Sequence, residues 1–194
     1  MLKQNSLLYG RIKIARQKQR NELPELHVNF YSIYSRFVLK SLRKTSFQTF
    51  LHWMLSTENI EDKMINTVDI KVFPASRKNG YNIAGKCNIF KGDIRIYPKT
   101  SAFCDSFSKK FGKEILIAYV GNRARAALIH ELLHLKYASD EQKVRELTEA
   151  YFSVYMKNQI TKNSSVLHGL IFNSKKYNSN IKHADLKLLH SVEA

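Results

Sequence analysis

The sequence is poor in several features that mark particular protein classes. It has only two cysteines, Cys87 and Cys104, which form no C-x-x-C pair, so neither a thiolate zinc site nor a disulfide scaffold is indicated. Two such residues are typical of reduced, buried thiols in an intracellular protein. No apolar run approaches the roughly 20 residues of a membrane helix, and we therefore expect no membrane partner. Internal repeats and low-complexity tracts are also absent, which leaves one globular domain, with or without helical extensions.

Acidic residues are scarce. The 194 residues include 16 Asp and Glu against 32 Lys and Arg, a net charge of +16. The excess is densest at the two ends, with ten Lys and Arg against two acids in residues 1–50 and six against two in residues 157–194. This balance favours a polyanionic partner, nucleic acid above all, bound through the basic N- and C-terminal regions. A lysine-rich, solvated surface explains the charge equally well.

The N-terminus lacks the features of a secretory signal. No acid precedes Glu22, and no sustained apolar stretch follows the first basic residues. An organelle transit peptide shares this basic, acid-poor composition, but we favour a basic arm. The chain is therefore expected to be intracellular, either cytoplasmic or nucleoid-associated.

The pattern along the chain predicts an α+β fold. Helical periodicity covers 28–56, and a β-like run over 68–73 is followed by a turn at Asn79-Gly80. Two further β-like segments, 82–90 and 92–97, precede a helical region that covers 102–120, although 114–120 is also compatible with a strand. Two helices are then expected, one over 122–137 and one that starts with Ser139 as its N-cap and ends near 158.

These patterns divide the chain into three regions. They are a basic helical N-terminal region over 1–65, a central core over 66–158 and a basic C-terminal extension over 159–194.

A His-Glu-x-x-His motif lies in the middle of the predicted helix 122–137. Positions four apart stack on one helix face, so His130 and His134 can present both imidazoles to one ion. Glu131 lies beside them and can act as a general base on a water molecule. Neutral imidazoles suit Zn²⁺, and a hydrolytic zinc site needs three protein ligands and one open position. The structural alternative is a pair of hydrogen-bonded core histidines.

The third ligand is expected among the acids that follow the motif. By helical rotation, Asp140 and Glu141 flank the apolar stripe of the next helix, so Asp140 is the first choice and Glu141 the second. Glu149 lies further off centre and is a third alternative. A first-turn acid that stabilises the helix dipole is the competing explanation of Asp140.

The segment HELLHLKYASD resembles the zincin peptidases, and most closely the SprT-like/WLM group of small zinc proteases. The resemblance covers roughly residues 90–155 and is tight over 128–140. It implies a zincin-like fold, in which a small, mostly antiparallel sheet packs on the active-site helix. It also implies that His130 and His134 bind zinc and that Glu131 is the general base. In that group the residue six positions after the second histidine is commonly histidine, and here it is Asp140.

The resemblance has further implications. Met-turn zincins also place a ligand six residues on, but they require glycine where this chain has Tyr137. Minigluzincins take glutamate from the following helix, which would favour Glu149. In zincins an edge strand aligns the peptide substrate by main-chain hydrogen bonds, and residues 93–96 are the best candidate for it. Tyr137, Tyr151 and His168 are conceivable donors to an oxyanion.

The main hypothesis is therefore a zinc-dependent metallopeptidase that hydrolyses peptide bonds, acting on proteins near or on nucleic acid. Its cofactor is Zn²⁺, its ligands are His130, His134 and Asp140, and its base is Glu131. The alternative, from a different class, is a nucleic-acid-binding protein with a degenerate or structural zincin-like helix. A steep salt dependence of DNA or RNA binding would distinguish it.

Overall fold

The computed structural model describes residues 8–15, 25–75, 82–158, 168 and 170–172 of the chain. Within these residues the chain has an α+β fold, as predicted. The strands are β1 (Ile12–Ile14), β2 (Thr67–Ile70), β3 (Gly85–Asn88) and β4 (Asp93–Ile96). The helices are α1 (Glu25–Leu42), α2 (Thr45–Glu58), the 3-10 helix η1 (Asp62–Met64), α3 (Ser101–Phe111), α4 (Lys113–Tyr137) and α5 (Glu141–Lys157). None of the helices in these residues has the length and apolarity needed to cross a bilayer.

The four strands form one mixed sheet in the order β1-β2-β4-β3. Both β1 and β4 run parallel to β2, and only β3 and β4 are antiparallel, so the prediction of a mostly antiparallel sheet is wrong. One reason is that β2 pairs with β4 and not with β3, the next strand along the chain. The other is β1, which the sequence pattern assigned to a helical region. Since α1 and α2 separate β1 from β2, this helical crossover returns the chain in the same direction.

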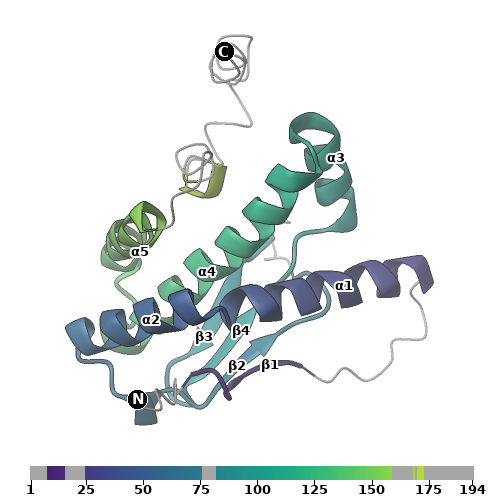
Figure 1. The fold of residues 1–194 in the computed structure, drawn as a ribbon. Helices are drawn as coiled ribbons and strands as arrows, with labels where there is room; N and C mark the ends of the chain where they lie inside the picture. Colours follow the sequence, from purple (N-terminus) through teal and green to yellow (C-terminus); the bar gives the residue numbers. More distant parts are fainter. Residues whose placement is uncertain (1–7, 16–24, 76–81, 159–167, 169, 173–194) are drawn as a thin grey trace, which may run out of the picture.

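The sheet has one covered face and one open face. Figure 1 shows α1 and α4 lying across the covered face, with α5 beside the C-terminal half of α4. Side chains that point toward these helices are completely buried, as for Val68 and Ile94. Alternate residues point the other way and are exposed, as for Lys13, Lys86 and Arg95. The fold therefore has two layers.

The N-terminal helices belong to the central core. The predicted helix 28–56 is divided at residues 43–44 into α1 and α2, and α1 packs against α4, β1 and β2. Buried apolar side chains from 8–15 and 25–65 join those of 66–158 in one hydrophobic cluster. Of the predicted C-terminal extension, only 168 and 170–172 are described, and the predicted turn at 79–80 lies outside the described residues.

Helix α4 carries the histidine motif and is longer than predicted. It starts at Lys113, so residues 114–120 are helical and not a strand. It ends at Ala138, which has a positive φ of 47° that few non-glycine residues adopt. Helix α5 follows after three residues, 138–140, and its N-cap is Asp140 instead of the predicted Ser139.

A buried carboxylate connects the ends of α2 and α4 to the middle of α5. Glu58, at the end of α2, accepts hydrogen bonds from the hydroxyls of Tyr137 on α4 (2.6 Å) and Tyr151 on α5, and from Lys136 Nζ (3.0 Å). Burial alone would raise the pKa of Glu58, but these hydrogen bonds outweigh it and the pKa is lowered. The ionised carboxylate thereby fixes the end of α4 relative to α5, next to the motif.

Candidate metal centre

The two imidazoles of the motif converge, as the sequence predicts. His130 and His134 lie one turn apart on α4, and their Nε2 atoms are 3.2 Å from each other. Their side chains are 22% and 15% exposed, so the pair lies at the surface of the core and open to solvent. Both rings therefore direct their Nε2 atoms toward one point.

Hydrogen bonds on the far side of each ring fix this orientation. His134 Nδ1 lies 2.6 Å from the carbonyl oxygen of Ala138, which can only accept. His130 Nδ1 lies 3.3 Å from the Thr148 hydroxyl, whose hydrogen is donated to the carbonyl of Val144 at 2.6 Å. Both Nδ1 atoms therefore carry the proton, and the two Nε2 lone pairs face each other. A cation between them would remove this repulsion.

A carboxylate from α5 completes the group. Glu141 Oε2 is 3.4 Å from His134 Nε2, and Glu141 Oε1 is 3.7 Å from His130 Nε2. The three residues together form a set that can hold a metal ion. Glu141 was the second choice of the sequence analysis, after Asp140.

Asp140, the first choice, is engaged elsewhere. Its carboxylate accepts a hydrogen bond from the backbone N–H of Lys143 at 3.1 Å and so caps α5. A capping side chain folds over the first turn of its own helix. Glu141 follows one residue later, has a longer side chain and extends from α5 toward α4 instead.

The two imidazoles are spaced as in a tetrahedral zinc site. For Zn–N distances of about 2.0–2.1 Å, tetrahedral geometry places ligand atoms about 3.3 Å apart. The two Nε2 atoms are 3.2 Å apart, and Glu141 approaches each ring with a different oxygen, Oε2 at 3.4 Å from His134 Nε2 and Oε1 at 3.7 Å from His130 Nε2. Two imidazoles and one carboxylate are also a ligand set that catalytic zinc sites use. The described residues supply no fourth ligand to this group, which leaves a position for water or substrate.

Glu141 is held in the ionised form that a metal requires. Burial raises its pKa, but the hydrogen bond from Arg145 Nε, at 2.8 Å, and the positive charge of Arg145 lower the pKa overall. A carboxylate that stays ionised in this position is ready to bind a cation.

Glu131 lies between the motif helix and the edge of the sheet. Its side chain is buried, and the residue is only 6% exposed. It contacts strand β3 so closely that a Cβ added to Gly85 would lie 2.6 Å from its Cγ and Oε1. Burial, followed by the negative charge of Glu131, raises the pKa of the neighbouring Cys87 to about 12. Because glycine has no Cβ, position 85 leaves room for the Glu131 carboxylate.

The remaining candidates from the sequence lie away from the metal group. Tyr137 and Tyr151 donate their hydroxyls to Glu58, so neither is placed as an oxyanion donor. His168 Nε2 lies 3.0 Å from Ser153 Oγ and 3.9 Å from Glu149, the third ligand alternative. Thr148 and Gly85 were not identified from the sequence, because their roles depend on packing between elements.

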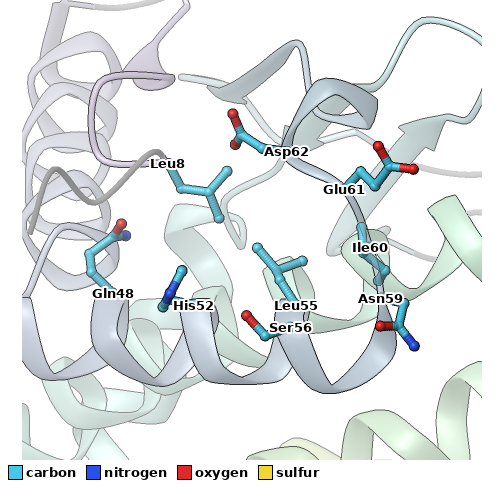
Figure 2. Close-up of a pocket in the computed structure, with 9 residues that line it drawn as sticks. All are labelled: Leu8, Gln48, His52, Leu55, Ser56, Asn59, Ile60, Glu61 and Asp62. Carbon is cyan, nitrogen blue, oxygen red and sulfur yellow. The ribbon is translucent and has the colours of Figure 1, made fainter.

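A separate cavity of about 440 Å³ lies against α2 (Figure 2). Gln48, His52 and Ser56 project from α2 at four-residue spacing, and Leu8 lies across from them. No residue of the metal group lines this cavity. Its lining residues are Leu8, Gln48, His52, Leu55, Ser56, Asn59, Ile60, Glu61 and Asp62.

Comparison with known proteins identifies no relative, since no family model, no curated protein and no solved structure matches the chain.

Thr148→Val is expected to weaken zinc binding about 10- to 100-fold, the usual cost of losing a partner that orients a metal-binding histidine. Valine keeps the shape of the side chain and removes the oxygen that accepts from His130 Nδ1. Thr148→Ser, which keeps the hydroxyl, should restore the affinity. A competition titration with a zinc-binding dye measures both, and equal affinities for the valine and serine variants would contradict the assignment.

Proposed function

We propose that this chain is a zinc-dependent metallopeptidase of the zincin type, similar to the SprT-like/WLM group. The observation that carries the proposal is the convergence of His130 Nε2, His134 Nε2 and a Glu141 carboxylate oxygen, with the buried Glu131 carboxylate beside the motif. This arrangement supports metal-assisted hydrolysis better than a core pair of histidines, because both Nδ1 hydrogens are already committed to other partners.

Each residue has a separate role in this proposal. His130, His134 and Glu141 would hold the ion. Zinc held there would supply a Lewis acid for a carbonyl and would lower the pKa of a water molecule to about 7. Glu131 accepts the proton of the attacking water and passes it to the leaving amine nitrogen as the peptide bond breaks. Thr148 and the Ala138 carbonyl keep the two rings in the required orientation.

The substrate strand is assigned to β3. Strand β4, the candidate from the sequence, lies inside the sheet between β2 and β3 and cannot accept another strand. Strand β3 is at the edge and lies directly beside Glu131 through Gly85. An extended peptide added to this edge would therefore pass the general base.

The charge of the chain supports work near nucleic acid. The net charge of +16 favours association with a polyanion, and we place the substrates among proteins bound to nucleic acid. The same charge supports the second candidate, a nucleic-acid-binding protein without catalysis. Both candidates predict salt-dependent binding, but only the peptidase requires the carboxylate of Glu131.

The test is cleavage of an unfolded protein such as casein by the zinc-loaded chain. Chelation should abolish cleavage, and one equivalent of added zinc should restore it, whereas Mg²⁺, which prefers octahedral oxygen ligands, should not. Cleavage that persists after the zinc has been removed, or a zinc-loaded chain that cleaves no unfolded protein, would contradict the proposal.

A further inference from the structure

The open edge of β3 offers backbone hydrogen bonds at two residues. Tyr97 N donates to Ala84 O at 2.9 Å, which makes Ala84 and Tyr97 a hydrogen-bonded pair of the antiparallel ladder. Such pairs alternate along the strands, so Lys86 and Asn88 bond to β4 while the N–H and C=O groups of Gly85 and Cys87 point outward. In the part of the chain that the structure describes, no backbone group pairs with this outer side.

The side chains of β3 divide between the two faces of the sheet. Gly85 and Cys87 face α4, and Gly85 contacts Glu131. Lys86 and Asn88 face the open side and are exposed. In a peptide added to this edge, the residue opposite Gly85 would therefore point toward the base, and the next residue would lie beside Lys86.

Two cations lie side by side at this position. Lys86 is directly opposite Arg95 in the β3–β4 register, and both are exposed. Like charges in directly opposed positions destabilise a sheet. Asp69 lies opposite Arg95 on β2 and pairs with Lys71 at 3.5 Å; among the described residues, no carboxylate lies within ion-pair distance of Lys86 or Arg95. The next β3 residue on the same face of the sheet, Asn88, is neutral.

We propose that the β3 edge selects an extended peptide with Asp or Glu in the position beside Lys86, one residue from the scissile bond. This inference rests on the proposed peptidase function and adds its specificity. An acidic side chain there would relieve the repulsion between Lys86 and Arg95. A nucleic-acid phosphate would also be attracted to the two cations and could accept from the outward amides, but it has no donor for the outward carbonyl groups of Gly85 and Cys87. The two cations and the outward backbone groups together favour a peptide as the occupant of this edge.

The experiment compares cleavage of a peptide library by the wild-type chain, by Lys86→Glu and by Lys13→Glu. Lys13 is a matched control because it is exposed on the same face of the sheet but on β1, at the opposite edge. Wild type should prefer Asp or Glu over Lys at one position next to the cleaved bond by about tenfold, as expected for exchanging an attractive for a repulsive cross-strand pair. Lys86→Glu should reverse this preference, and Lys13→Glu should leave it unchanged.

A position two residues further along the peptide, beside Asn88, should show no charge preference in any variant. Retained cleavage with no acidic preference, or an acidic preference that survives Lys86→Glu, would overturn the inference and leave the peptidase proposal intact. A loss of DNA binding in Lys86→Glu with an unchanged cleavage profile would assign the two cations to nucleic acid instead. Absence of cleavage in wild type would refute both proposals at once.

Discussion

Glu131→Gln is expected to keep one bound zinc and to lose peptide cleavage by about 10³-fold or more, the upper range for removal of a general base. Glutamine has nearly the same shape, so the buried contact with Gly85 is kept and the fold should survive. The only change is that an amide cannot accept the proton of water. Zinc content and kcat/KM for a peptide substrate, measured on the same sample, separate metal loss from loss of the base.

Glu114→Gln is the matched control for this prediction. It removes a carboxylate from the same helix at an exposed position in the first turn, far along the chain from the motif. Its kcat/KM should stay within about twofold of wild type, since only a small helix-dipole contribution is lost. Full activity in Glu131→Gln would contradict this role and assign the base to another residue.

Glu141→Gln is expected to weaken zinc binding by more than about 100-fold, while Asp140→Asn should leave the affinity unchanged. Removal of a residue that binds the metal directly should weaken zinc binding by more than the 10- to 100-fold expected for removal of a residue that only orients a ligand. The two substitutions are chemically identical and one residue apart. Asparagine remains an N-cap acceptor for the Lys143 N–H, so α5 should start at the same place.

Zinc titrations of the two variants decide between the ligands. The opposite pattern, with Asp140→Asn losing zinc and Glu141→Gln keeping it, would restore the assignment made from the sequence. Equal losses in both would show that the turn at 138–140 rearranges when the metal binds.

The elements that position the motif could be predicted from periodicity. Apolar spacing and capping residues indicated helices over most of α1, α2, α4 and α5, and alternation indicated β4. The four-residue spacing of His130 and His134 was sufficient to predict that their rings converge, because helical geometry alone determines it. These predictions depend on local sequence, where the pattern is informative.

The arrangement of the sheet could not be predicted, since it depends on contacts between distant segments. Strand β1 has three residues and lies in a basic segment, so its pattern gives no sign of pairing with β2. Its parallel pairing, together with that of β2 and β4, leaves β3 and β4 as the one antiparallel pair of this sheet. The β-like segments 82–90 and 92–97 were recognised, but which of β3 and β4 lies at the edge depends on β2.

The prediction of the third ligand was limited in the same way, because it depends on the exact geometry of one turn. Asp140 and Glu141 are adjacent in sequence, and adjacent helical residues point about 100° apart. Which of the two side chains faces α4 therefore depends on which residue begins α5. That residue is set by Ala138, whose positive φ would be easier to anticipate at a glycine. The same conformation places the Ala138 carbonyl 2.6 Å from His134 Nδ1, so the turn affects both the ring orientation and which acid lies near the two imidazoles.

Zinc content after purification is the most direct test of the metal centre. Elemental analysis should find one zinc per wild-type chain and less than about a tenth of that in His130→Ala and His134→Ala, because two remaining ligands hold the ion weakly. His52→Ala, an exposed histidine on α2, should retain one equivalent. One zinc per chain in both motif variants, or none in wild type after zinc is supplied, would contradict the account.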